Sequence, residues 1–408
     1  MSHCTEQCSL PSQDDAGVSA AWLAVFSLAV GVFGLLTAEY LPASLLSPMA
    51  DSLGVSEALA GQSVTVTAIV ALFSGLLVPG LTRNMDRRTV LLGFTLLMIA
   101  SNLLVALSPN LTVLLLMRVL LGIAIGGFWS MVAAVAMRLV PDELLPRALS
   151  IIFSGISVGT VVAVPLGSYL GGVVGWRSTF VAAAIIGLIT FLFQFFTLPR
   201  MAPRQGVTLG MIFSVAMRPG IGAGLLGCIL IHGGHFALFT YIRPMLESTT
   251  AMGENGLALV LLGFGVANFA GTVLAGYLLS KMPLGTLVMM PAVVGLSALA
   301  LVLLPATLPG QVLLVALWGM AFGAIPVAWS NWIARSIPDQ AESAGGMVVA
   351  AVQSSIAAGA AAGGLMFSHS GITGVFASAG CVLLIAALFV ALRVKGDIIP
   401  PDTDSDSA

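Results

Sequence analysis

The stretch from residue 111 to residue 136, LTVLLLMRVLLGIAIGGFWSMVAAVA, has the length and composition of a membrane-spanning helix. Arg118 is its only charged residue. A helix rises about 1.5 Å per residue, so about 20 apolar residues cross the roughly 30 Å hydrocarbon core of a bilayer. The apolar residues run on without the alternation that a membrane-spanning β-strand would show. This stretch therefore predicts a helical membrane protein.

Eleven further apolar runs of similar length occupy the rest of the chain. The 408 residues are 58% hydrophobic and only 8% charged, whereas soluble domains are about 25% charged. The runs form two groups of six, at 23–46, 58–81, 90–107, 111–136, 149–173 and 180–198, then at 221–242, 257–279, 284–304, 312–333, 344–367 and 375–392. Because lipid cannot hydrogen-bond to backbone groups, each run is expected to be a helix. The predicted fold is an all-α membrane protein with twelve transmembrane helices in two six-helix bundles.

Polar segments set the expected domain boundaries. A tail over 1–21 precedes a bundle over 22–198, and the polar loop 199–219 precedes a second bundle over 220–394, which a tail over 395–408 follows. The loop is the longest internal polar segment and contains a proline, which breaks helices. The end of the C-terminal tail is polar and acidic, and we expect it to be disordered.

The two groups of runs are related by an internal repeat. Five residues of the fourth run and its following loop recur 197 positions later: Gly122, Gly126, Arg138, Pro141 and Asp142 recur as Gly319, Gly323, Arg335, Pro338 and Asp339. Both runs cross the membrane in the same direction, and parallel repeats of this kind are typical of alternating-access carriers. Arg118 departs from the repeat, because its counterpart is Val315. Only the first half carries that charge inside a span.

The distribution of basic residues predicts the orientation of the chain. If the N-terminus is inside, only Arg177 and Arg243 fall in outer loops. Twelve basic residues fall in inner loops and tails: Arg83, Arg87, Arg88, Arg138, Arg147, Arg200, Arg204, Arg218, Lys281, Arg335, Arg393 and Lys395. We therefore expect a multi-pass protein of the bacterial inner membrane with both termini in the cytoplasm.

Composition and motifs disfavour several functional classes. The net charge of −2 does not suit nucleic-acid binding. The four cysteines, Cys4, Cys8, Cys228 and Cys381, suggest neither a disulfide framework nor a metal-ligand cluster. The sequence has no phosphate-binding loop and no nucleophile elbow, so we expect no cofactor, no metal and no enzymatic activity. A carrier is the leading interpretation, and an uptake symporter or a membrane receptor are the alternatives.

The predicted spans contain one acid, Glu39, and one base, Arg118. Ionisable residues inside a span are energetically costly and usually functional. Each lies seven residues from the outer end of its run, on the order of 10 Å below the outer surface, so the two are candidates for a pair or for alternating partners. A carboxyl group there is a candidate proton-coupling site, because burial and a nearby guanidinium favour different protonation states. Two alternatives remain: the span stops at Tyr40 and leaves Glu39 in the interface, and Arg118 ties span ends together.

His232 and His235 lie three residues apart on one face of the seventh predicted helix. Histidine titrates near physiological pH, so either side chain can bind protons or hydrogen-bond to a substrate. His235 is at about the depth of Glu39 and is followed by aromatic residues that include Tyr241. The alternative is a buried histidine with a packing role. We assign proton coupling to Glu39, Arg118 and His235.

Other polar and aromatic residues within the spans are candidate substrate contacts. Carriers bind substrate near the middle of the membrane, and indole rings can stack on a planar ligand. The full candidate set is His232, His235, Tyr241, Asn268, Trp129, Trp329, Asn331 and Gln353. Hydrogen bonding between helices is the alternative role for the amide side chains.

Two motifs resemble those of major facilitator antiporters. Residues 118–127, RVLLGIAIGG, resemble the fourth-span motif, and Pro165-Leu-Gly167 resembles the fifth-span antiporter motif. The second motif departs from the family at Val164, where glycine is usual. The loop 83–88, RNMDRR, keeps the family's basic pair and loses much of the rest of the loop pattern.

From about residue 22 to residue 394 the chain resembles the twelve-spanning drug:proton antiporter branch of the major facilitator superfamily. Within that branch it resembles the bacterial purine ribonucleoside efflux pumps, on residues 39–49, 61–67, 126–129, 239–244 and 329–335. The resemblance implies efflux of purine ribonucleosides such as inosine and guanosine in exchange for protons. It places Glu39 on the first-span acidic position of the branch and Arg118 on its fourth-span arginine. An antiporter for sugars or drugs and an uptake symporter are alternatives on the same fold. We expect a monomer.

Overall fold

The computed structural model describes residues 21–141, 144–202, 218, 220–249, 253–304, 307–336 and 341–394. All regular elements in these ranges are helices. Nearly all of both predicted tails and most of the predicted loop 199–219 lie outside the described residues. The boundaries of those three segments therefore stay predictions.

Thirteen helices follow one another along the described chain. The N-terminal half contains α1 (Trp22–Ser44), α2 (Leu46–Leu53), α3 (Glu57–Leu81), α4 (Arg87–Ala106), α5 (Leu111–Leu139), α6 (Leu145–Val173) and α7 (Trp176–Thr197). The C-terminal half contains α9 (Ile221–Thr240), α10 (Ile242–Thr249), α11 (Glu254–Lys281), α12 (Pro283–Leu303), α13 (Leu308–Ser336) and α14 (Ala341–Arg393). Each predicted apolar run corresponds to one long helix or to one part of α14.

Three helices of the N-terminal half begin at residues that cap them. Ser56, Asp86 and Asn110 have extended backbones, and each side chain accepts a hydrogen bond from the backbone N–H three residues later. Such caps satisfy a donor that the first helical turn leaves without a partner. The polar residues between the apolar runs thus fix where α3, α4 and α5 start.

The helix α14 contains two of the predicted spans. Its apolar part, Val349–Arg393, has 45 residues, which would give a straight helix of about 68 Å, more than twice the hydrocarbon thickness. Gly371 interrupts it with φ 64° and ψ −168°, a conformation outside the helical region that glycine adopts readily. Eleven helices in the described residues are long and apolar enough to cross a membrane. Since α14 is two spans joined at Gly371, the predicted twelve spans are confirmed.

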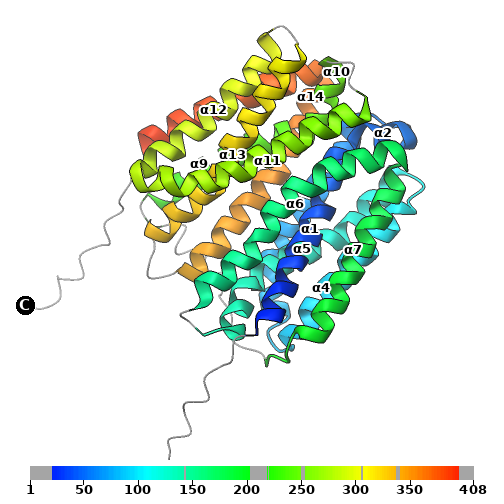
Figure 1. Ribbon diagram of the computed structural model, residues 1–408, viewed down its shortest axis with the longest axis vertical. Helices are drawn as coiled ribbons and strands as arrows, with labels where there is room; N and C mark the ends of the chain where they lie inside the picture. Colours follow the sequence, from blue (N-terminus) through cyan, green and yellow to red (C-terminus); the bar gives the residue numbers. More distant parts are fainter. Residues whose placement is uncertain are drawn as a thin grey trace, which may run out of the picture.

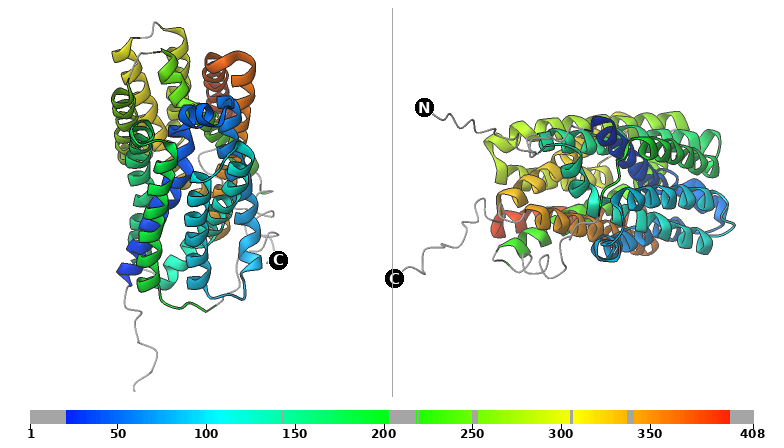
Figure 2. Two further views of the ribbon diagram at one scale, coloured as in Figure 1. Left: turned by 90° about the vertical axis from the view of Figure 1, so that its right-hand side faces the viewer. Right: turned by 90° about the horizontal axis from the view of Figure 1, so that it is seen from below.

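The short helices α2 and α10 lie together at one end of the molecule, which we call the α2/α10 end (Figure 1). Each follows a break at the end of a long helix, α2 after α1 and α10 after α9. Seen from below, the helices of the N-terminal half gather on one side and those of the C-terminal half on the other (Figure 2). The halves meet mainly where α14 packs on α3 and α11 packs on α6.

The glycine repeat in the sequence is a repeated helix contact in the structure. A Cβ atom added to Gly122 of α5 would lie 2.7 Å from the backbone oxygen of Thr67 in α3, and one added to Gly126 would lie even closer to the backbone oxygen of Ala71. The equivalent Gly319 and Gly323 bring α13 against the backbone of α11 in the same way. Only glycine permits so close an approach of two helices. The α3–α5 and α11–α13 pairs are therefore equivalent.

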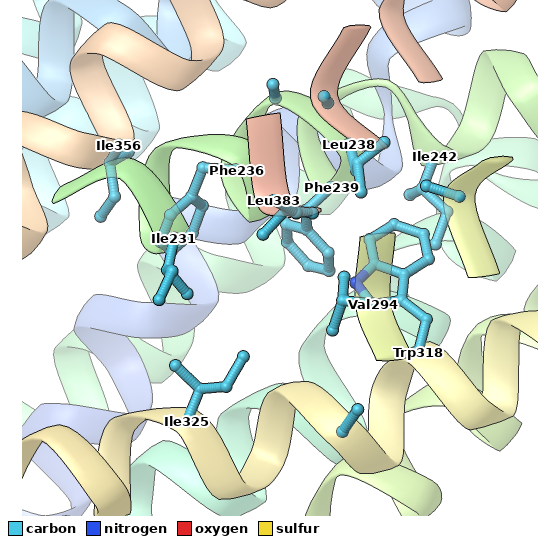
Figure 3. Packing of buried hydrophobic residues seen from close by; sticks show 14 of the residues in the cluster. Ile231, Phe236, Leu238, Phe239, Ile242, Val294, Trp318, Ile325, Ile356 and Leu383 are labelled. Carbon is cyan, nitrogen blue, oxygen red and sulfur yellow. The ribbon is translucent and has the colours of Figure 1, made fainter. Parts of the chain in front are cut away.

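Apolar packing joins the halves at the α2/α10 end. The largest buried cluster is built mostly from the C-terminal half, including Phe236 and Phe239 of α9 and Trp318 of α13 (Figure 3). The buried residues that the N-terminal half adds to it are Ala43, Leu46, Ala50, Ala60, Val64, Ala68 and Val164. All of them lie in the parts of α1, α2, α3 and α6 nearer the α2/α10 end. The two halves are closed against each other there.

Candidate functional site between the two halves

Glu39 lies on α1, five residues before the helix ends at Ser44. Its side chain is 5% exposed and borders a cavity of about 10 Å³. The residues around this cavity come from both halves: Glu39, Tyr40, Ala43 and Val64 from one, and Phe236, Phe239, Thr240 and Ile356 from the other. A cavity of this size holds about one water molecule. Because α1 continues beyond Tyr40 to Ser44, Glu39 does not lie at the end of its helix.

Glu39 is linked to the other half through Gln353 of α14. The Gln353 side chain lies beside the Glu39 carboxyl group and interacts with it. One oxygen of each side chain, Oε1 of Glu39 and Oε1 of Gln353, is buried without a hydrogen-bond partner in the described structure. Buried polar atoms are nearly always paired, so an unpaired one needs an explanation. Two such atoms, one from each half, mark this interface as a place where further hydrogen bonds can form.

Arg118 of α5 is fully buried and binds to α1 and α3 rather than to the Glu39 carboxylate. Its Nη1 donates to the backbone oxygen of Ala38 at 2.9 Å, and its Nε donates to Thr67 Oγ1 at 2.9 Å. Among the described residues no ion pair within 4.0 Å joins Arg118 to Glu39. The guanidinium still acts on Glu39 through its charge. The predicted pair is therefore a pair of neighbours without direct contact in this conformation.

Pro42 explains why Arg118 finds an acceptor in the middle of a helix. In an α-helix the N–H of residue 42 would donate to the carbonyl of residue 38, but proline has no N–H. Pro42 lies inside α1, so the carbonyl of Ala38 has no helical donor. Arg118 Nη1 donates to this carbonyl instead. The proline in α1 and the buried arginine in α5 have three helices between them in the sequence, and they thus form one local interaction beside Glu39.

Both candidate histidines lie inside the packing of the C-terminal half. His235 Nδ1 accepts a hydrogen bond of 3.0 Å from Trp318 Nε1, and its ring stacks on Phe322 with the planes 1° apart. His232 Nδ1 contacts the backbone oxygen of Cys228 at 2.9 Å. Neither histidine borders the cavity beside Glu39. Their contacts match the packing alternative that the sequence left open.

The remaining candidates do not gather around Glu39. Asn268 of α11 donates to the backbone oxygen of Gly319 at 3.3 Å, which is a hydrogen bond between helices. Trp129 packs edge-on against Phe128, and Trp329 packs edge-on against Trp332. Asn331 is half-buried on α13. Of the candidate substrate contacts, the structure brings only Gln353 into contact with Glu39.

Tyr241 occupies the break between α9 and α10 and reaches the other half. Its ring stacks on Phe367 at 5.3 Å, and its hydroxyl donates to the backbone oxygen of Ala360 at 3.5 Å. A Cβ atom on Gly61 of α3 would collide with that hydroxyl. Tyr241 therefore closes the α2/α10 end by filling the space that Gly61 leaves, instead of facing the cavity.

The structure corrects the placement of Arg243 in an outer loop. Arg243 lies on α10 and is only 2% exposed. Its Nη1 donates to the backbone oxygen of Ser44 at 2.9 Å and to Ser168 Oγ at 3.2 Å, and its Nε forms an ion pair of 2.7 Å with Glu247. The sequence-based assignment placed Arg243 in a loop because nothing in the sequence indicates that the residues after α9 fold back as a helix. The adjacent Pro244 was the one available signal of a break.

Sequence comparisons place the chain in a known family. A sequence model described as Major Facilitator Superfamily matches residues 28–354 and, a second time, residues 224–407. The protein named purine ribonucleoside efflux pump NepI in Salmonella enteritidis PT4 is 43% identical over 374 residues, which cover 92% of this chain and 94% of that protein. The protein of the same name in Salmonella typhimurium LT2 has the same identity and coverage.

Structural comparisons agree on the fold. A D-xylose-proton symporter matches with a TM-score of 0.75 at 19% identity, over 93% of this chain and 99% of that one. A bacterial homologue of the human lysosomal transporter Spinster, in an inward-facing and occupied conformation, matches with a TM-score of 0.73 at 16% identity, over 90% and 96% of the two chains. At these identities the likeness shows the fold alone. Together with the family match and the relatives, it shows that the chain belongs to the major facilitator superfamily, as a multi-pass membrane transporter and not an enzyme.

Proposed function

We propose that this protein exports purine ribonucleosides such as inosine and guanosine in exchange for protons. The substrate class rests on the relatives that are 43% identical over 92% of the chain and carry the name of purine ribonucleoside efflux pumps. Proton coupling rests on one observation. Glu39, the acid that the sequence singled out inside a span, is buried at the contact between the halves, and the Gln353 side chain of the other half lies beside it.

The proposed cycle uses rocking of the two halves. When the α2/α10 end is open, Glu39 takes a proton from outside. When that end is closed and the opposite end opens, Glu39 releases the proton to the cytoplasm and substrate binds. The return movement exports the substrate. Because the nucleoside is neutral, one-for-one exchange moves one charge, and the membrane potential contributes about 2.3 kcal/mol per 100 mV.

The proposed cycle implies a membrane location and an orientation. We place the protein in the bacterial inner membrane, with the α2/α10 end outside and both termini in the cytoplasm. The excess of Lys and Arg in the segments at the opposite end supports this orientation. The proposed bundles span residues 22–198 and 220–394, joined by a cytoplasmic loop over 199–219. The protein works as a monomer, since each chain contains both halves of the site.

Transport into inverted membrane vesicles tests the proposed function. With an imposed proton gradient, wild-type vesicles should accumulate labelled inosine, and Glu39→Gln vesicles should lose the gradient-driven part because the amide cannot release a proton. Asp51→Asn is the matched control, since Asp51 is an exposed acid of α2. Gradient-driven accumulation retained in Glu39→Gln would sink the role of Glu39.

The same vesicles separate the alternatives on this fold. Inosine, guanosine, arabinose and a cationic dye are compared under the same gradient. If arabinose or the dye moves while the nucleosides stay inert, the protein is an antiporter for sugars or drugs. If nucleoside moves with the protons instead of against them, the protein is an uptake symporter.

A further inference from the structure

The last part of α1 contains a second carbonyl without a helical donor. Pro42 leaves the carbonyl of Ala38 without one, as described above. Pro48, the third residue of α2, stands four positions after Ser44 and likewise lacks an N–H. The carbonyls of Ala38 and Ser44 are thus both deprived of the donor that a continuous helix would supply. They lie six residues apart, about 9 Å along the helix.

Two buried arginines from opposite halves occupy these carbonyls. Arg118, which belongs to the N-terminal half like α1 itself, donates to Ala38 at 2.9 Å. Arg243, which belongs to the C-terminal half, donates to Ser44 at 2.9 Å. Glu39 lies in the segment between the two attachment points. The segment that carries Glu39 is therefore held at one end by its own half and at the other end by the opposite half.

Arg243 is also the centre of a polar network that crosses between the halves. Its Nη1 reaches Ser168 of α6, and its Nε binds Glu247. The second oxygen of Glu247 accepts a hydrogen bond of 2.6 Å from Ser47 of α2. A buried guanidinium is stable only while hydrogen bonds and an opposite charge compensate it. Separation of the halves at this end breaks the bonds to Ser44, Ser168 and Ser47 together.

We propose that Arg243 is a gating and positioning residue, which fixes the Glu39 segment of α1 when the α2/α10 end closes and releases it when that end opens. The contact of Arg118 lies within one half and survives the rocking movement, whereas the contact of Arg243 with Ser44 crosses the halves and cannot. The state of the gate thus sets how firmly the Glu39 carboxyl is held. This inference rests on the rocking cycle of the proposed function and does not depend on the substrate.

Cysteine accessibility in whole cells measures the gate directly. Val64 borders the cavity beside Glu39, so Val64→Cys reports whether water reaches it from the α2/α10 end. The reporter is built in full-length protein in which the four natural cysteines are replaced by serine or alanine. A membrane-impermeant maleimide should label the closed protein slowly. Adding Arg243→Gln should raise the labelling rate several-fold, because the network that joins the halves is lost.

Arg177→Gln is the matched control. Arg177 also lies at the α2/α10 end, but it donates to Ser52 at 2.8 Å and to the backbone of Ser108 at 3.1 Å, both in its own half. Its loss should leave the labelling rate unchanged. In addition, the external-pH profile of proton-driven exchange should shift in Arg243→Gln and stay in place in Arg177→Gln, since only the first residue holds the Glu39 segment.

Two results would overturn the proposal. One is an unchanged labelling rate in folded Arg243→Gln, and the other is an equal rise in Arg177→Gln. If Arg243→Gln does not fold, Ser47→Ala takes its place, because it removes one bond across the halves and keeps the buried ion pair. It should raise labelling less than Arg243→Gln would, and an unchanged rate contradicts the proposal. Labelling needs no substrate, so a failed nucleoside assay leaves this test standing.

Discussion

At the scale of single residues, Thr67 is the side chain that aims Arg118. Its hydroxyl donates to the backbone oxygen of Ser63 at 2.8 Å and accepts from Arg118 Nε at 2.9 Å. With Nε fixed in this way, Nη1 reaches the carbonyl of Ala38. The position of a buried charge close to Glu39 thus depends on one hydroxyl group in α3.

Replacing Thr67 should therefore destabilise the protein and weaken exchange. Thr67→Val keeps the shape of the side chain but leaves Arg118 Nε without its hydroxyl partner, which costs about 1–3 kcal/mol for a buried charged donor. Thermal unfolding in detergent and gradient-driven inosine transport are the measurements. Thr65→Val is the control, because the buried Thr65 hydroxyl has no partner to lose. Equal losses of stability in the two variants would contradict the role given to Thr67.

At the scale of helices, the single residue Gly371 makes two spans out of α14. The sequence predicts two runs with seven residues between them, 344–367 and 375–392, and the structure fills that gap with helix up to and beyond one glycine. The positive φ of 64° at Gly371 is costly for a residue with a Cβ atom. The turn between the last two spans therefore depends on this glycine more than on a loop.

Gly371→Ala should lower stability by about 1–2 kcal/mol, the cost of a left-handed conformation for an L-residue. Gly276→Ala in α11 is the control, since Gly276 is helical and has open space around its Cβ position. That substitution should stabilise the helix by about 0.5–1 kcal/mol. Thermal unfolding of the two purified variants measures both changes in stability. If both substitutions stabilise the protein, or both destabilise it, the role given to Gly371 is contradicted.

At the scale of the whole molecule, the buried arginines Arg118 and Arg243 each belong to one half and have no counterpart in the other. Arg118 corresponds to Val315 in the repeat. Arg243 is the second residue of α10, and the second residue of α2 is Ser47. The halves share their helix contacts but not these two buried charges. Closure at the α2/α10 end therefore brings together different residues from the two halves, and the contacts there are not related by the repeat.

This asymmetry predicts that closure depends on external pH. Ser47 Oγ lies 2.6 Å from both Glu57 Oε1 and Glu247 Oε2, but its one hydroxyl proton can serve only one ionised carboxylate. The other short contact of Ser47 is a hydrogen bond only if that carboxyl group is protonated and donates to Ser47 Oγ. Glu247 is neutralised by Arg243, so that proton belongs on Glu57, which also faces Asp51. Raising external pH should remove the proton and loosen the closed end.

The maleimide labelling of Val64→Cys measures this pH dependence. The labelling rate, corrected for the reactivity of the reagent at each pH, should rise with external pH in the parent protein. Glu57→Gln should flatten that rise, because the amide donates to Ser47 at every pH. Asp51→Asn is the control, and its labelling rate should still rise with external pH. A flat profile in the parent protein would remove Glu57 from the gate.

The sequence predicts the frame of this molecule well because the frame follows from hydrophobicity and periodicity. Twelve runs of apolar residues and a glycine repeat predict twelve spans and two equivalent helix pairs, and the structure contains them. The site was predictable only in part. The depth of Glu39 followed from counting residues, but its contact with Gln353 depends on how two distant helices pack. The acceptor of Arg118 likewise depends on Pro42, whose effect on the Ala38 carbonyl follows only once α1 is known to continue past the proline.

The positions and partners of several polar and charged side chains could not be predicted from the sequence. Arg243 reads as a loop residue because nothing in its neighbours predicts a short helix that turns inward. The packing of His235 between Phe322 and Trp318 could not be predicted either, because those two residues belong to a helix that lies more than 70 residues further along the chain. Both differences concern polar side chains whose partners are remote in sequence, whereas apolar spans are defined by their own residues.

The small cavity beside Glu39 has a consequence for energy conservation in the cell. A proton crosses a membrane protein rapidly along a file of hydrogen-bonded water molecules, and about 10 Å³ holds roughly one such molecule. In this conformation the cavity beside the carboxyl group is therefore too small to hold a file of water molecules. On the proposed proton-coupled cycle, we therefore expect that the idle protein does not short-circuit the proton gradient and that respiratory energy is drawn down only by complete exchange.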